Sequence, residues 1–235
     1  MPAGKSSHDP GVAKLVERQM RNWELARAQR VTVPEPQRKE VESFVCISRC
    51  VGAGGKEVAS LLAEKLGWPV FDKEILDRMA GDDELRRQVY ESMDERDVSW
   101  YEETLRSLMQ REFVKNDYFH KLSTTVLSLA RQGHAVFLGR GIDQILPRTI
   151  GFRVRLVAPL EQCIERYARL FSLTLGEARG EVVRLEQQRS EFIRRHFGIG
   201  AGEATRNDLL INMARWTPAQ AVELILSARK ILGVA

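Results

Sequence analysis

The chain alternates between two patterns of apolar residues. Short apolar, β-leaning runs bounded by glycine, proline or charge predict strands at 44–48, 68–72, 134–141, 152–159 and 208–212. Between these runs, apolar residues recur at the spacing of amphipathic helices. Strands that alternate with helices favour a parallel sheet covered on both faces. We therefore expect an α/β fold with three layers, α/β/α, around a five-stranded parallel sheet.

The helical stretches begin and end at recognisable signals. The helix VASLLAEKLG ends at Gly67, and Thr217 caps a final helix with the sequence PAQAVELILSARK. Another helix begins at Leu160, and charged helical sequence continues to about His196. The segment 73–132 is helical, with apolar residues available for buried faces: Leu105, Leu108, Met109, Phe113, Leu122, Val126 and Leu129.

Residues 1–40 stand apart from the rest of the chain. Residues 1–11 are polar and small, and we expect them to be disordered. From Val12 to about Arg30 apolar residues recur at helical spacing, and two prolines within 31–43 then predict a linker. This helix packs either on the body of the protein or on a partner, including a second copy of the chain. The body, residues 41–235, is expected to form one domain.

Composition excludes several classes of protein. Hydrophobic residues make up 43% of the chain and charged residues 29%, the mix of a soluble globular protein. No apolar run approaches the roughly 18 residues of a membrane helix, and the N-terminus lacks the hydrophobic stretch of a secretory signal. Cys46, Cys50 and Cys163 are an odd, sparse set, which is against a disulfide framework, so we expect a cytoplasmic location.

The charge is mildly basic and evenly spread. Lys and Arg total 36 against 32 Asp and Glu, a net charge of +4, and the acids are interleaved with the bases. A dedicated nucleic-acid binder more often concentrates positive charge on one face. We therefore expect small-molecule partners, without dedicated binding to nucleic acid or membranes.

Three candidate motifs follow predicted strands: the glycine-rich turn after Ser48, Asp72 after the second strand, and Arg140 after the third. In parallel sheets ligands bind beyond the carboxyl ends of the strands, where these motifs lie. The turn RCVGAGGKE stands between a strand and a helix, an arrangement in which backbone N–H groups and the helix N-terminus bind phosphate.

The turn departs from the common phosphate-loop signature G-x-x-x-x-G-K-[S/T]. Alignment on Lys56 puts Cys50 at the first glycine and Glu57 at the hydroxyl residue. Alignment on Gly54 instead puts Gly55 where the lysine should be. A purely structural glycine turn is the alternative to a phosphate loop.

The stretch ISRCVGAGGKEVASLLAEKLGWPVFDKEIL, followed by FLGRG and DLLIN, resembles the cytidylate kinase-like family, relatives of cytidylate kinase among the P-loop nucleoside monophosphate kinases. The resemblance covers residues 44–228, and RQMRNWELAR is similar to an arm found in some members. It implies a five-stranded parallel sheet, ATP with Mg²⁺, and phosphoryl transfer to a pyrimidine nucleoside monophosphate. On this basis we expect a helical acceptor-side insertion at about 73–132 and a mobile lid at about 161–206.

For the donor, the resemblance implies that ATP phosphates bind the loop residues Gly52, Ala53, Gly54, Gly55, Lys56, Glu57 and Val58. Lys56 then reaches the β- and γ-phosphates, although it stands one position late, and Glu57 contacts Mg²⁺ directly or through water. Arg49 is the nearest other basic residue if Lys56 does not serve, and it is also a candidate for the acceptor side.

For the acceptor, Arg140 matches the arginine of the family's Gly-Arg strand end, which holds the acceptor monophosphate. A planar guanidinium suits this role because it binds two phosphate oxygens at once. The alternative for Arg140 is an arginine of a surface turn. Asp72 matches an aspartate beside the acceptor site, and its alternative is an N-cap for the helix KEILDRMA.

Residues 161–195 contain seven arginines and no lysine. Arg166 and Arg169 follow PLEQCIE as the lid-entry arginines do in the family, and Arg189 matches an arginine of the lid exit. The resemblance implies that such arginines surround the transferred phosphoryl group. Six glutamates share the segment, several at i,i+4 spacing, so solvated ion pairs are the alternative for most of the arginines.

Together these features favour a kinase that phosphorylates CMP or dCMP with ATP. Two alternatives stay open. One is a nucleotide-binding module without efficient turnover that acts through partners, and the other is a kinase for a non-nucleotide acceptor. The displaced lysine and the missing hydroxyl residue keep the first alternative open.

Overall fold

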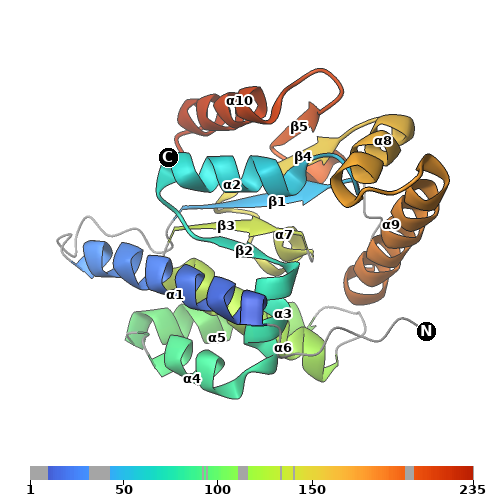
Figure 1. Ribbon diagram of the computed structural model, residues 1–235. Helices are drawn as coiled ribbons and strands as arrows, with labels where there is room; N and C mark the ends of the chain where they lie inside the picture. Colours follow the sequence, from blue (N-terminus) through green and yellow to red (C-terminus); the bar gives the residue numbers. More distant parts are fainter. Residues whose placement is uncertain are drawn as a thin grey trace.

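The computed structural model describes residues 10–31, 43–91, 93, 95–110, 116–132, 134–139, 141–198 and 204–234, and within them five strands form one parallel sheet (Figure 1). The strand order is β2-β3-β1-β4-β5, and each neighbouring pair is parallel. The strands are β1 Phe44–Arg49, β2 Val70–Asp72, β3 Ala135–Leu138, β4 Phe152–Val157 and β5 Leu209–Asn212. This confirms the α/β class and the parallel sheet expected from the sequence.

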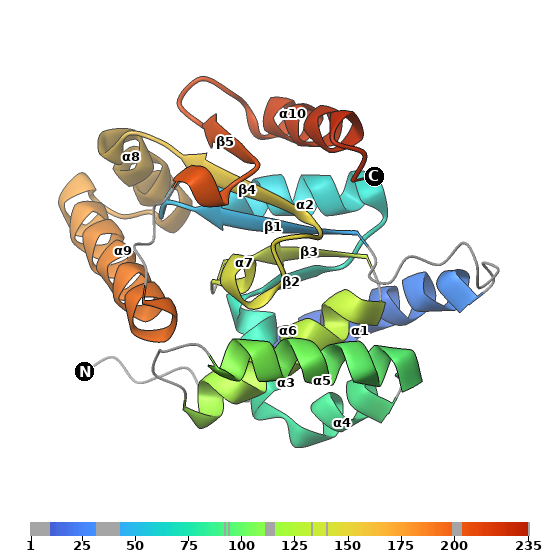
Figure 2. The same cartoon turned by 180° about the vertical axis from the view of Figure 1, so that it is seen from behind.

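Helices cover the sheet on both faces and at one end (Figures 1 and 2). They are α1 Pro10–Val31, α2 Gly55–Leu66, α3 Lys73–Gly81, α4 Asp83–Glu91, α5 Glu95–Gln110, α6 Asp117–Gln132, α7 Ile142–Ile145, α8 Leu160–Phe171, α9 Leu175–Phe197 and α10 Pro218–Ile231, with a 3₁₀ turn at Ala204–Arg206. No helix in these described ranges is both long and apolar enough to span a bilayer.

The three layers follow from the alternation of side chains along each strand. Val45 and Ile47 of β1 are buried in a cluster with apolar residues of α2 and α10. Phe44 and Cys46 point to the opposite face, where they join apolar residues of α1, α3, α6 and α7. Both faces of β1 are therefore shielded from solvent, which explains why its sequence is a continuous apolar run.

Helix α1 packs on the body of the protein. Val16, Met20 and Trp23 are buried in the cluster shared with α3 and α6. The Trp23 indole donates a hydrogen bond to the Leu129 carbonyl at 3.4 Å. The Gln19 amide oxygen accepts the backbone N–H of Val70 at 2.8 Å, so α1 also pairs with the free edge of β2. Self-association through α1 stays a prediction.

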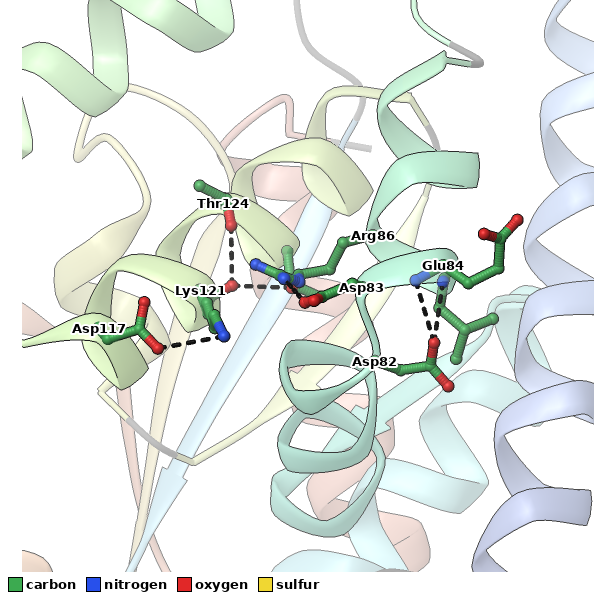
Figure 3. Close-up of polar contacts among 9 residues, drawn as sticks. Asp82, Asp83, Glu84, Arg86, Asp117, Lys121 and Thr124 are labelled. Carbon is green, nitrogen blue, oxygen red and sulfur yellow. Dashed lines mark hydrogen bonds and ion pairs between the residues drawn. The ribbon is translucent and has the colours of Figure 1, made fainter.

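The segment between β2 and β3 contains α3, α4, α5 and α6. Figure 3 shows its polar contacts: the Asp82 carboxylate accepts the N–H groups of Glu84 and Leu85 and so begins α4. In α6, Asp117 pairs with Lys121 at 3.1 Å. Four of the apolar positions expected to face the interior are buried, namely Leu108, Leu122, Val126 and Leu129.

The charged helical sequence after Leu160 is broken into two helices, α8 and α9, which lie against each other beyond one end of the sheet (Figure 1). Ser172 ends α8 in the left-handed conformation, with φ of 53°. Thr174 then begins α9 through a capping box with Glu177. The sequence T-L-G-E carries this signal, which the periodicity of the charged residues obscures.

Several expectations lie outside the described residues. These are the disorder of residues 1–9, most of the linker (32–42), the side chain of Phe113, residues 199–203 of the expected lid, and Arg140. Helix α1 begins at Pro10, two residues before the predicted start at Val12.

Candidate active site

The glycine-rich turn joins the end of β1 to the first turn of α2. Gly52 and Gly54 have φ of +83° and +80°, a region that favours glycine. A Cβ on Gly52 would lie 2.3 Å from the Cys163 carbonyl oxygen, so α8 packs directly against the turn. The N-terminus of the 12-residue helix α2 adds its free N–H groups and partial positive charge. This geometry suits a bound phosphate.

A cavity of about 210 Å³ opens beside the turn, at the carboxyl ends of β1, β3 and β4. Strand register explains part of its lining, because Ser48 of β1 pairs with Arg155 of β4. Among the described residues its charged lining is five basic and two acidic side chains: Arg49, Lys73, Arg155, Arg189, Arg206, Asp143 and Glu186. Excess positive charge in a confined space favours an anionic ligand.

Arg49 is a half-buried cation of the cavity. Burial lowers its pKa to about 9, and the positive charges of Arg189 and Arg155 act in the same direction, partly offset by Asp72 and Glu186. The guanidinium therefore stays protonated at neutral pH, but at an electrostatic cost that an anion beside it would relieve.

Helix α9 is docked on the turn in this structure. The Glu186 carboxylate accepts the backbone N–H of Val51 at 2.9 Å. Arg189, one turn further along, lies 3.7 Å from Glu186 and donates to the Arg49 carbonyl at 3.4 Å. These contacts bring Arg189, a predicted lid arginine, to the cavity.

Lys56 is not among the residues that line the cavity. Its Nζ lies 3.5 Å from an oxygen of Asp72 and 3.8 Å from one of Glu74, and its side chain is 67% exposed. Asp72 also accepts the N–H groups of Glu74 and Ile75, so it is the N-cap of α3. The structure therefore shows Asp72 as an N-cap, the alternative role that the sequence offered. A contact between Asp72 and an acceptor stays a prediction.

Substitutions at Asp72 separate these two roles. Asp72→Ala is expected to lower the free energy of unfolding by about 1 kcal/mol, because the cap is lost, whereas Asp72→Asn keeps a good cap. Chemical denaturation measures both. If Asp72→Asn retains stability but raises the KM for an acceptor, the carboxylate also contacts that acceptor. An equal loss of stability in both variants would contradict the cap.

The remaining predicted residues divide between the turn and the surface. Arg166 of α8 is half-buried, and its Nη1 lies 2.6 Å from where a Cβ on Gly54 would stand. Arg169 is exposed. Glu57 is exposed in the first turn of α2. In the described part of the chain no three His, Cys, Asp or Glu side chains gather as a metal cage.

Sequence reasoning missed several cavity residues. Arg155 lies near the end of the buried strand β4, and a charged residue in that position was a usable signal. Arg206 ends the 3₁₀ turn before β5 and Asn207 follows it, and Phe192 presents an aromatic ring from α9. No local pattern marks these three, because they reach the cavity only through the packing of α9 and β5.

The parallel sheet, the glycine turn before α2 and the basic cavity at the strand ends define a kinase-like P-loop fold. Residues 44–215 match the model of the Cytidylate kinase-like family, and the chain belongs to this family. No curated protein matches the sequence.

One solved structure with a TM-score above 0.5 shares the fold. An uncharacterized protein from Eubacterium ventriosum is 17% identical with a TM-score of 0.66, over 81% of this chain and 99% of that one. A gluconokinase from Sinorhizobium meliloti is 15% identical with a TM-score of 0.46, over 83% and 95% of the two chains. A shikimate kinase from Acinetobacter baumannii is 18% identical with a TM-score of 0.43, over 83% and 95%.

Proposed function

We propose that the protein transfers the γ-phosphoryl group of ATP to a pyrimidine nucleoside monophosphate, with CMP or dCMP as the first candidate. The observation that carries this proposal is the position of a strongly basic cavity directly beside a glycine turn and a helix N-terminus. Two neighbouring anion sites, one open at the turn and one confined in the cavity, suit a phosphoryl donor and a phosphorylated acceptor.

The donor would bind on the turn. Its phosphates would accept hydrogen bonds from the backbone of residues 52–58, and Arg166 would lie above Gly54 on the same side. Glu57 would hold Mg²⁺, because this ion is commonly held by one or two protein carboxylates together with substrate phosphates. When bound, Mg²⁺ supplies charge neutralisation of the β- and γ-phosphates.

The acceptor would occupy the cavity. Arg155, Arg189 and Arg206 offer guanidinium groups to its phosphate, and Phe192 offers a ring face to its base. Asp143, Gln144 and Asn207 supply hydrogen-bonding groups that can select one base. This division of charge and polarity supports a nucleotide over a small sugar or acid.

Arg140 is proposed as a further clamp on the acceptor phosphate, because FLGRG resembles the Gly-Arg strand end of the family. Arg140→Ala should reduce kcat/KM for the acceptor by a factor equivalent to about 2 kcal/mol of lost transition-state stabilisation. The variant should keep its ATP affinity within twofold of the wild type. Arg140→Lys should also be impaired, because lysine lacks the two-pronged geometry. Steady-state kinetics with the acceptor varied at saturating ATP measures both variants. An unchanged kcat and acceptor KM in Arg140→Ala would show that Arg140 does not hold the acceptor phosphate.

A nucleotide-binding module without efficient turnover is the second candidate. The ion pairs of Lys56 with Asp72 and Glu74 favour it, because they take the loop lysine away from a bound phosphate. A coupled ADP-release assay over a panel of nucleoside monophosphates separates the two. Acceptor-dependent ADP release supports the kinase, whereas ATP binding without release for any acceptor supports the module. Release with shikimate or gluconate alone would favour a non-nucleotide acceptor.

A further inference from the structure

The side chain of Arg49 runs through a slot between two glycines. A Cβ on Gly55 would lie 2.7 Å from Cγ of Arg49, and a Cβ on Gly139 would lie 2.0 Å from its Nη1. Real Cβ atoms do not approach other atoms this closely, so any larger residue at either position would displace the arginine. Gly55 begins α2 and Gly139 follows β3, so the slot joins the glycine turn to the cavity.

The slot holds a guanidinium whose charge the protein's own carboxylates offset only in part. Among the described residues, no carboxylate lies within ion-pair distance of Arg49, although the surface of the same chain carries many such pairs. Arg189 and Arg155 repel it, whereas Asp72 and Glu186 attract it from beyond ion-pair distance. Holding a half-buried guanidinium beside two other arginines without an ion-pair partner is costly, which favours a ligand that supplies the counter-charge.

The loop lysine does not supply this charge. Lys56 is mostly exposed and lies between Asp72 and Glu74, on the side of α3. Arg49 instead passes beneath the first residue of α2 and reaches the cavity that its guanidinium lines. It stands where a phosphoryl group would pass from the turn to an acceptor.

We infer that Arg49, held in the slot between Gly55 and Gly139, is the catalytic cation that contacts the transferred phosphoryl group in place of the loop lysine. The inference rests on the proposed function. In the reaction, an acceptor oxygen bonds to the γ-phosphorus while the bond to the β,γ-bridging oxygen breaks, and that oxygen leaves with its electron pair on ADP. The guanidinium donates hydrogen bonds to the equatorial oxygens as their charge is redistributed.

The test compares four variants with the wild type: Arg49→Met, Arg49→Lys, Lys56→Met and, as a control, Lys65→Met. Methionine can follow the aliphatic path of Arg49 without its charge. Lys65 lies in the last turn of α2 and pairs with Glu223 on the surface, away from the cavity. Calorimetry measures the Kd of ATP and of ADP with Mg²⁺, and steady-state assays measure kcat with the acceptor found in the nucleotide panel.

For Arg49→Met we expect a fall in kcat on the order of a hundredfold, the effect of removing one donor to a developing charge. Its ATP affinity should fall about tenfold while its ADP affinity stays within twofold, because ADP lacks the γ-phosphoryl group. Arg49→Lys should show a smaller fall in kcat and in ATP affinity than Arg49→Met. Lys56→Met should also show a smaller fall in kcat than Arg49→Met. Lys65→Met should match the wild type.

The inference would be overturned if a folded Arg49→Met variant kept both the wild-type kcat and the wild-type ratio of ATP affinity to ADP affinity. A larger loss of kcat in Lys56→Met than in Arg49→Met would also overturn it. If Arg49→Met does not fold, the Arg49→Lys variant serves as the test. A wild-type kcat in Arg49→Lys would contradict a specific role of the guanidinium group. If the wild type transfers no phosphoryl to any acceptor, the proposed function fails, and the ATP-to-ADP preference still tests Arg49.

Discussion

Gly54→Val is expected to weaken ATP binding on the order of a thousandfold, about 4 kcal/mol, while the protein stays folded. Gly54 has φ of +80°, and a Cβ there would lie 2.6 Å from Nη1 of Arg166. The far end of an arginine can move aside, so the fold survives, with a cost of about 1–3 kcal/mol for the strained backbone. The valine side chain would instead fill the space where a phosphate approaches the backbone of the turn.

Calorimetric titration with ATP measures this effect, and thermal unfolding verifies the fold. Gly180→Ala is the matched control, because a Cβ at this exposed position of α9 meets nothing within 4 Å. The control should bind ATP as the wild type does and gain about 0.5–1 kcal/mol of stability, since alanine is the better helix former. Wild-type ATP affinity in a folded Gly54→Val would show that the turn is structural and binds no phosphate.

Arg153→Met is expected to destabilise the protein by about 3–5 kcal/mol, because each buried carbonyl left without a donor costs about 1–3 kcal/mol. Arg153 is 1% exposed and lies in the middle of the sheet. Its guanidinium donates to the carbonyls of Ile150 at 2.8 Å, Leu146 at 3.0 Å and Pro147 at 2.7 Å. These carbonyls belong to the turn after α7, so Arg153 fixes the segment that carries the cavity residues Asp143 and Gln144.

Chemical denaturation compares the free energies of unfolding of Arg153→Met and Arg155→Met. Both arginines lie on β4, but Arg155 is half-buried and lines the cavity, so its replacement should cost less than about 1 kcal/mol. Equal effects on the free energy of unfolding in the two variants would contradict the structural role of Arg153. The carbonyls left without donors are the physical reason for the large loss.

The sheet and the turn could be predicted because their signals are local. The apolar runs FVCIS and DLLIN have no helical periodicity, and glycines at positive φ mark the turn after β1. Gly67 and Thr217 likewise mark helix ends through their own backbone and side-chain hydrogen bonds. Each of these features depends on a few consecutive residues.

The cavity could be predicted only in part because its chemistry depends on tertiary contacts. The spacing around Lys56 gave no sign that Asp72 and Glu74 would bind its ammonium group, since all three meet only when the end of β2 and the start of α3 come near the first turn of α2. Glu186 bonds to the backbone of Val51 from 135 residues away. The sequence predicted Arg49 as the basic residue nearest to Lys56 and as a candidate for the acceptor side, but not the slot that positions it, which depends on Gly139 of another strand end.

The most direct test of the central claim follows the phosphoryl group itself. The purified protein is incubated with Mg²⁺, CMP and ATP radiolabelled in its γ-phosphoryl group, and the products are separated by chromatography, with Gly54→Val and Arg49→Met in parallel. The account predicts that label appears in CDP in amounts equal to the ADP formed, and that both variants transfer far less of it. Label that stays in ATP, or appears only as inorganic phosphate, for CMP, dCMP and the other nucleoside monophosphates would contradict it.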